Sequence, residues 1–513
     1  MDIRLNKENI QLERLSAAGR GQTVVEGEIT LPGGLREEAR ALHAGAMAVV
    51  DAVEAMQDRA AVSGKVVFHA LYTQGDPGKV QAVEASADFT HVLDMPGMQP
   101  RNLCSMDVQV EHVDASASGG RLTMKAVVTL LGRAISQQPV EALSGLSGDS
   151  TLQLSTRTMK VKRMVAEGSG EVLMREEFML PEGQNVRDTL YGTAFAQMTD
   201  VTGGLGRAGV AGRVMLEAVH ASDMPGKPVV ITRHTLPFEH AVDLNGEDGQ
   251  QLAGRVTIRD VAVASQEMDG RRILRAEVLL GVQAWAERKE ELTVLDDAYT
   301  VSGDELRLTS QEVSCCVEDV RVQTAESGKM MLMLPDGAPP VRSMLCAFAV
   351  PVMTGREQLG GRMTAEGMLE VTLLYMSDDN PAPVTVRQEE PFRVTFAAEC
   401  TPEDFVSLSV SDAEASAITS DRVEMKYIMH MTASGVRTEQ TRLVTDAISV
   451  SAEEMDSGIV LYFTQPGETL WDIAKRYRVP VQEVRALNPD LSGEPKTGQG
   501  VVVWRRAQEV LRV

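Results

Sequence analysis

The sequence predicts a mainly β protein, with three tandem β-rich domains followed by a small β-α-α-β module at the C-terminus. Two observations lead to this fold class. Three long blocks of the chain align with one another, and each alternates strand-like apolar runs with turns rich in Asp, Pro and Gly. Near the C-terminus, the apolar spacing changes from the period of a strand to that of a helix.

Four landmarks define the repeat and recur in the same order. Each copy has an L-P-x-G turn, a glycine in a strand, a phenylalanine in the next strand and an arginine before the last strand. The turns begin at Leu31, Leu180 and Leu334, the glycines are Gly64, Gly212 and Gly367, the phenylalanines are Phe89, Phe238 and Phe392, and the arginines are Arg121, Arg272 and Arg422. The period of about 150 residues is that of a domain and not of a solenoid unit. We therefore predict β domains at 1–150, 151–303 and 304–452.

One segment of the first copy, residues 35–57, is rich in Ala and Glu and would form a helix by propensity alone. The matching segments of the other copies contain Gly203-Gly204 and Pro351, which are unfavourable in a helix. Because homologous copies share a fold, we predict a strand in all three.

The composition is that of an ordinary folded protein. Of the 513 residues, 43% are hydrophobic and 24% are charged, and a chain of this length predicts about three to four domains. Aromatic residues make up 4% and methionine occurs 27 times, so we expect aliphatic cores in which methionine fills gaps. The five cysteines form no C-x-x-C pair, and we expect them to be buried thiols in a reducing compartment.

The net charge of −23 argues against nucleic acid as a main partner and against simple attraction to anionic lipid. It suits solubility, or an acidic face that meets a basic partner. The first residues lack the apolar stretch of a secretory signal, and no apolar run is long enough for a membrane span. We therefore expect a cytoplasmic protein.

The chain shows no recognisable catalytic motif. Gly204 to Gly209 match G-x-G-x-x-G, but a dinucleotide loop opens a helix and this segment precedes a strand, so we predict a turn. The histidines are dispersed, and His69 and His220 are expected to be half-buried sheet residues. Doubled carboxylates such as Asp296-Asp297 are expected in solvated turns and edges. We predict no enzyme, cofactor or metal; an enzyme would need a polar cluster that spacing does not reveal.

The C-terminal module, 458–506, should begin with a strand over 459–463 and end with one over 501–503. Thr469 stands at the N-cap of the first helix, with Asp472 placed for a capping box. A second helix should end before Asn488-Pro489. The apolar positions of the two helices are Leu470, Ile473, Ala474 and Tyr477, and Val481, Val484 and Leu487.

These residues resemble a LysM domain. Tyr462, Gly467, Thr469, Leu470, Ile473 and Ala474 match the family pattern Y-x-V-x-x-G-D-T-L-x-x-I-A, and Asn488-Pro489 and Gly498-Gln499 match its later landmarks. Glu468 replaces the usual Asp, and the ending VVVWRR differs from the usual Ile-Pro strand. The resemblance implies a groove for N-acetylglucosamine glycans at Gly467, Glu468, Thr469, Leu470, Trp471, Asn488, Pro489 and Asp490. Leu470 would be needed for the core whatever the ligand, whereas exposure of Glu468, Trp471 or Trp504 would call for a functional explanation.

The three repeats are similar to the SPOCS domains of spore coat proteins, and three of them before one LysM domain resemble the SipL-type spore morphogenesis proteins. This resemblance implies a non-enzymatic scaffold or adaptor in the mother-cell cytoplasm, at the forespore surface. Its LysM domain would dock on SpoIVA, the coat-basement ATPase, alongside other coat proteins. The alternative is a protein that binds peptidoglycan at the spore or cell wall.

Overall fold

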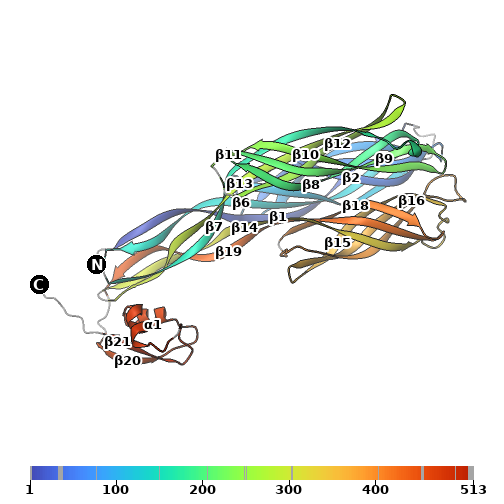
Figure 1. The fold of residues 1–513 in the computed structure, drawn as a ribbon. Coiled ribbons are helices and arrows are strands. Elements are labelled where there is room, and N and C mark those ends of the chain that lie inside the picture. Colours follow the sequence, from blue (N-terminus) through green and yellow to red (C-terminus); the bar gives the residue numbers. More distant parts are fainter. Residues whose placement is uncertain are drawn as a thin grey trace.

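The computed structural model describes all residues except 1–2, 33–38, 77, 149–150, 205, 248, 250, 302–303, 403, 452–455, 492 and 506–513. It shows an elongated β body and a small helical module, which lies near the N-terminus at one end of the body (Figure 1). No helix in the described part of the chain is long and apolar enough to cross a membrane.

The body consists of three units, each with two antiparallel sheets of three long strands. In the first unit, β1 (Arg4–Thr30), β6 (Arg121–Ser147) and β5 (Leu103–Ser118) form one sheet, and β2 (Ala39–Met56), β3 (Arg59–Gln74) and β4 (Val80–Asp94) form the other. In the second unit, one sheet contains β7 (Leu152–Met179), β13 (Arg271–Thr300) and β12 (Gln251–Met268). The other sheet contains β8 (Val186–Gly204), β9 (Arg207–Met224) and β10 (Lys227–Asp243). In the third unit, one sheet contains β14 (Glu305–Met333), β19 (Arg422–Val450) and β18 (Phe405–Ala417). The other sheet contains β15 (Ser343–Leu359), β16 (Arg362–Met376) and β17 (Val384–Phe396). A short strand β11 (Asn245–Gly246) and a 3-10 turn η2 (Glu182–Gln184) belong to the second unit. The prediction of a mainly β fold is confirmed.

The landmarks of the sequence repeat have the same structural role in every unit. The repeat glycine and phenylalanine are cross-strand partners, namely Gly64 and Phe89, Gly212 and Phe238, and Gly367 and Phe392. A Cβ atom on any of the three glycines would clash with a backbone carbonyl of the neighbouring strand. Glycine is therefore required there because two backbones approach each other closely.

The L-P-x-G turns also share one hydrogen bond. The backbone N–H of the landmark leucine donates to a carbonyl near the start of the last long strand of its unit, which is β6, β13 or β19. These bonds run from Leu31 to Gly120 at 2.9 Å, from Leu180 to Arg272 at 3.0 Å, and from Leu334 to Asp421 at 2.9 Å. This bond fixes the point at which the chain leaves one sheet for the other. Gly33 and Gly34 of the first turn lie outside the described residues.

Two local predictions are confirmed. The described part of the Ala- and Glu-rich segment forms strand β2 (Ala39–Met56), because these residues pair with β3 and tertiary pairing overrides helix propensity. Residues 35–38 lie outside the described residues. The G-x-G-x-x-G segment is a hairpin turn between β8 and β9, with Gly206 at φ +76°; its Leu205 lies outside the described residues. His69 is half-buried as expected, whereas His220 is fully buried.

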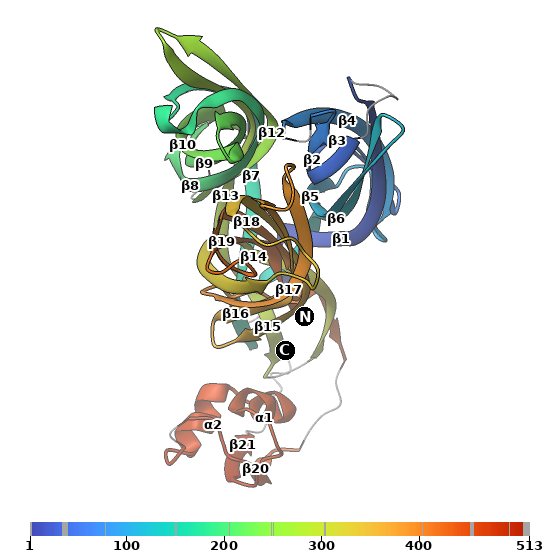
Figure 2. The same cartoon turned by 90° about the vertical axis from the view of Figure 1, so that its right-hand side faces the viewer.

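The three units are joined through a stalk, which we define as the paired ends of β1 and β6, of β7 and β13, and of β14 and β19 that extend beyond the other strands (Figure 1). These strands are long enough to extend, since they contain between 27 and 30 residues. Their side chains form a core shared by all three units, with Ile10, Leu12, Val140, Met159, Val161, Val294, Cys315 and Leu443. The units therefore form one body, seen in Figure 2 as three adjacent lobes.

A buried charge cluster lies within the stalk. The Lys162 ammonium is 2.8 Å from Asp319, 3.5 Å from Glu287 and 3.8 Å from Glu13, so it links carboxylates of three units. Burial opposes the charge of Lys162, but the carboxylates of Asp319 and Glu287 outweigh it and raise its pKa. Glu13, Lys162 and Cys316 each stand 18 residues before the landmark leucine of their copy, so equivalent positions of the repeat differ in chemistry here.

Burial of the cysteines is confirmed for Cys315, Cys316, Cys346 and Cys400. Cys104 is the exception, since it lies partly exposed on β5, whose side chains alternate between the core and solvent.

Candidate functional site

The C-terminal module has the predicted order of elements: strand β20 (Gly458–Phe463), helix α1 (Leu470–Tyr477), helix α2 (Val481–Leu487) and strand β21 (Gly500–Arg505). The two strands pair in antiparallel fashion. The helices cover one face of this sheet, and the buried core contains Leu470, Ile473, Ala474, Val479, Val484, Val501 and Val503. The predicted apolar positions Leu470, Ile473, Ala474 and Val484 belong to this core, and Tyr477 and Val481 pack against it while partly exposed. The prediction is wrong for Leu487, which is exposed at the end of α2.

The capping box at the start of α1 is confirmed. The Thr469 hydroxyl accepts from the Asp472 N–H at 3.2 Å, and the Asp472 carboxylate accepts from the Thr469 N–H at 2.9 Å. The helix ends at Tyr477, and its C-cap, Arg478, adopts a left-handed conformation at φ 51° while its backbone N–H donates to the carbonyls of Ala474 and Lys475. Both ends of α1 are thus fixed by local bonds.

The first loop of the predicted groove holds Gly467, exposed at φ +80°, and Glu468. The Glu468 carboxylate accepts from the Tyr462 hydroxyl at 2.7 Å and from the Gln465 N–H at 2.8 Å, and it pairs with Arg476 at 2.6 Å. The Gln465 N–H and the Tyr462 hydroxyl lower the pKa of Glu468. Its carboxylate is therefore engaged within the module.

The second loop is held by Asn488, whose side chain is buried. Its amide donates to the carbonyls of Val484 and Val502, both at 2.7 Å, and accepts from the Val502 N–H at 2.8 Å. Pro489 and Asp490, which follow it, are exposed. Asn488 thus fastens the loop to the closing strand and leaves the next two residues open to solvent.

Sequence reasoning missed Glu494, which connects the two halves of the groove. Its carboxylate accepts from the Leu470 N–H at 2.7 Å, so the segment after α2 lies beside the start of α1. Leu470 is itself buried in the core. Of the eight predicted groove residues, Gly467, Pro489 and Asp490 are exposed, Glu468 and Thr469 are partly exposed, and Leu470 and Asn488 are buried.

The eighth residue, Trp471, faces the stalk. Its indole N–H donates to Asp297 at 2.7 Å, and its ring meets Tyr299 edge-on with the centroids 5.0 Å apart. The Lys475 ammonium also contacts Asp297, at 2.6 and 2.7 Å, and the Tyr299 hydroxyl donates to the Val479 carbonyl at 2.7 Å. We call Asp297, Tyr299, Trp471 and Lys475 the clamp.

The clamp corrects the interpretation of Asp296-Asp297 as a purely solvated doublet. Asp297 lies on strand β13, and its carboxylate is mostly covered by the module. Asp296 is the extra residue of a β-bulge, since the register of β13 against β7 shifts between Leu295 and Asp297, and it pairs instead with Arg157 at 3.2 Å. No local signal in the sequence distinguishes the two aspartates, since the partners of Asp297 lie more than 170 residues away.

An apolar face covers the outside of the module's sheet. Ile459, Leu461 and Phe463 alternate along β20 and are 73%, 57% and 59% exposed, and Trp504, the partner of Ile459, is 41% exposed. We call these four residues the apolar sheet face. Contiguous exposed apolar side chains of this kind mark interaction sites.

No group of three or more His, Cys, Asp or Glu side chains is placed to hold a metal ion within the part of the chain that the structure describes.

Two family models match the chain. Residues 40–118, from β2 to the end of β5, match the SipL SPOCS domain, and residues 462–504 match the LysM domain. No curated protein and no solved structure gives a significant match. Both matched families consist of non-catalytic binding or scaffold domains. The chain therefore carries a SipL SPOCS domain and a C-terminal LysM domain, the domain content of a SipL-type, sporulation-related protein whose LysM module is of the peptidoglycan-binding kind.

Proposed function

We propose that this protein is a non-enzymatic scaffold or adaptor in endospore coat assembly. In this proposal its LysM domain docks on a SpoIVA-like coat-basement ATPase at the forespore surface, on the mother-cell side, and the three β units hold other coat proteins. The observation that carries the proposal is the apolar sheet face of the LysM module.

The chemistry of this face favours a protein partner over a glycan. Glycans are rich in hydroxyl groups, which need polar partners, whereas Ile459, Leu461 and Phe463 offer none. Covering a large apolar side chain contributes about 1.5–3 kcal/mol, and tryptophan is enriched among the residues that dominate protein interfaces. The face is also held in one orientation by the clamp, which suits a module that presents a docking surface.

Glycan binding remains the second candidate, because Gly467, Pro489 and Asp490 stay exposed at the predicted groove. The polar side chains of Glu468 and Asn488, however, already make hydrogen bonds within the module. A glycan would have to rely on the remaining backbone groups and on Asp490.

A paired binding experiment separates the two candidates. We expect Leu461→Glu to abolish retention of the full chain by the coat ATPase, because it places a charge in the apolar sheet face. Leu359→Glu, at an exposed leucine on strand β15 of the third unit, is the matched control and should bind normally. Asp490→Ala should leave ATPase binding unchanged. The opposite outcome would be that the wild type does not bind the ATPase but is retained by insoluble peptidoglycan, and that Asp490→Ala removes this retention. It would establish glycan binding as the function of the LysM domain.

Localisation provides an independent test. A chain that lacks 459–513 should remain in the mother cell without gathering at the forespore. If the truncated chain still reaches the forespore, targeting lies in the β units and the role proposed for the LysM domain is wrong.

A further inference from the structure

The strand end that holds the LysM module has counterparts in the other two units. In each unit the last long strand carries a β-bulge near its end, where its register against the neighbouring strand shifts. The extra residues are Ser144 on β6, Asp296 on β13 and Thr445 on β19. The residues that follow the three bulges are therefore structurally equivalent.

The third unit repeats the chemistry of the clamp at this position. Asp297-Ala298-Tyr299 follows the bulge of β13, and Asp446-Ala447-Ile448 follows the bulge of β19. In both strands the aspartate carboxylate accepts a hydrogen bond from the N–H of the next alanine, at 2.9 Å. Both alanines are buried in one shared core, so the residues on either side of them point away from that core.

The first unit lacks this chemistry. Its equivalent residues are Gly145-Leu146-Ser147, and Leu146 belongs to the shared core. The two positions that point away from the core therefore carry neither a carboxylate nor a large apolar side chain. Among the three units, the third is the one that resembles the site of the clamp.

The strand end of the third unit is open where that of the second unit is covered. Tyr299 is 4% exposed because the module packs on it, whereas Ile448 is 54% exposed. The Asp297 carboxylate binds two groups of helix α1, whereas no lysine or arginine among the described residues pairs with Asp446. A carboxylate beside an exposed aliphatic side chain matches what α1 presents, namely an indole ring with its N–H and an ammonium group.

The open strand end also lies within reach of the module. The Arg478 guanidinium is 3.8 Å from Glu305 on β14, the strand that pairs with β19. Glu305 is two residues from the cross-strand partner of Ile448. Residues 451–457 connect β19 to β20 and can span about 25 Å when extended, whereas Asp446 lies about 13 Å before the end of β19.

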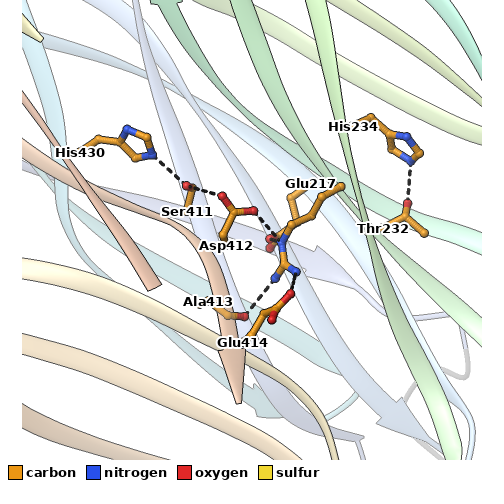
Figure 3. Close-up of polar contacts among 9 residues, drawn as sticks. Glu217, Thr232, His234, Ser411, Asp412, Ala413, Glu414 and His430 are labelled. Atoms are coloured by element: carbon orange, nitrogen blue, oxygen red, sulfur yellow. Dashed lines mark hydrogen bonds and ion pairs between the residues drawn. The ribbon is translucent and has the colours of Figure 1, made fainter. Parts of the chain in front are cut away.

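The body keeps the two strand ends at a fixed separation. Away from the stalk, the Arg233 guanidinium on β10 lies 3.0 Å from Glu414 and 3.2 Å from Asp412 on β18, and it donates to the Ala413 carbonyl at 3.0 Å (Figure 3). The shared core of the stalk joins the same two units at the other end. A change of docking site would therefore move the module and leave the body as it is.

We propose that the end of β19 is a second docking site for the LysM module, where Asp446 accepts from the same two groups of α1 and Ile448 packs against the indole ring. This site is weaker than the clamp, because isoleucine has no hydroxyl to donate to the Val479 carbonyl as Tyr299 does at 2.7 Å. Loss of one such hydrogen bond corresponds to about fivefold to tenfold lower occupancy. The apolar sheet face points in a different direction at each site, whatever partner it binds.

Spin labels on the module and on the body distinguish the two positions in the full chain. Gln482→Cys on α2 and Lys160→Cys on β7 supply exposed labelling sites, and Cys104→Ser removes the native cysteine that is partly exposed. Pulsed electron–electron resonance then measures the distance between the labels. We expect one main distance in the otherwise unaltered chain. Asp297→Ala combined with Tyr299→Phe weakens the clamp and should shift the main population to a second discrete distance.

Further variants assign the second distance to β19. Adding Asp446→Ala and Ile448→Ala to the weakened clamp should replace the second distance by a broad distribution, whereas Ser147→Ala, at the equivalent position of the first unit, should leave it unchanged. With the clamp intact, Ile448→Tyr should raise the second population about fivefold by restoring the hydroxyl. An unchanged first distance or a broad distribution in the chain with the weakened clamp would overturn the proposal, and so would a second distance that survives the loss of Asp446 and Ile448.

Discussion

The contacts that join the three β units differ in kind from the contact that joins the LysM module to them. The units share broad apolar cores and a buried charge cluster, and strands from all three contribute to each. The module rests on the stalk mainly through the clamp, where two of its side chains converge on the single carboxylate of Asp297. This difference teaches that separating the units would expose broad apolar surfaces and buried charges, whereas releasing the module would break mainly the few contacts of the clamp.

The largest effect is expected from the charge cluster inside the stalk. Lys162→Met leaves Glu13, Glu287 and Asp319 without their buried cation and should destabilise the body by about 3–5 kcal/mol, measured by denaturant unfolding. Lys160→Met is the matched control, because the Lys160 side chain is exposed and its ammonium lies 4.0 Å from the equally exposed carboxylate of Glu291. Equal losses for the two variants would show that the cluster does not hold the units together.

The next effect depends on pH and concerns a histidine inside the second unit. Burial, with His234 nearby, lowers the pKa of His220 to about 4 from an ordinary 6.5, while its ring nitrogens bond to Thr189 and Thr232 at 3.0 and 2.8 Å. Because the unfolded chain takes up the proton first, this stability is present above pH 6.5 and is lost as the pH falls toward about 4.

The loss should reach about 3 kcal/mol, given about 1.4 kcal/mol for each pKa unit. Thermal unfolding across this pH range measures it, and His220→Gln should make the profile less steep by about this amount, while His69, whose pKa burial also lowers to about 4, keeps its own contribution. The raised pKa of Glu13, caused mainly by burial, acts in the opposite direction. A His220→Gln profile parallel to that of the wild type would refute the assignment.

A smaller and local effect is expected at the clamp. Asp297→Ala removes the acceptor shared by Trp471 and Lys475 and should weaken the module's contact by about 1–3 kcal/mol, while the unfolding of the body stays the same. Faster hydrogen exchange in α1 would report it. Asp296→Ala, one residue away and directed at Arg157, should leave α1 unaffected. Unchanged exchange in Asp297→Ala would mean that other contacts hold the module.

The smallest effect sharpens the comparison among the units themselves. Glu84, Arg233 and Arg387 each stand five residues before the landmark phenylalanine of their copy. The two arginines pair with carboxylates of another unit, whereas burial and Asp260 of the second unit raise the pKa of Glu84. Glu84→Arg should supply the missing pair and stabilise the body by about 0.2–1 kcal/mol, as seen in thermal unfolding. Asp88→Arg, on the same strand, should give no such gain.

The LysM module shows how much a sequence reveals when structure is local. Thr469 and Asp472 are three residues apart, and their reciprocal bonds form within one helical turn. The landmarks of the repeat could also be identified from the sequence, because residues such as Gly64 and Phe89 belong to one hairpin and lie close together along the chain. Local spacing therefore sufficed to predict the strands, the two helices and the cap.

The sequence by itself determined the β architecture, the repeat and the fold of the module, because each depends on periodicity and on contacts between neighbouring strands or turns. The tertiary structure alone decided that the stalk is shared, that Trp471 faces Asp297, and that Arg233 contacts Glu414. The physical reason is distance along the chain. The side chains of these sites lie some 150 residues or more apart in the sequence, and only the packing of the three units brings them together.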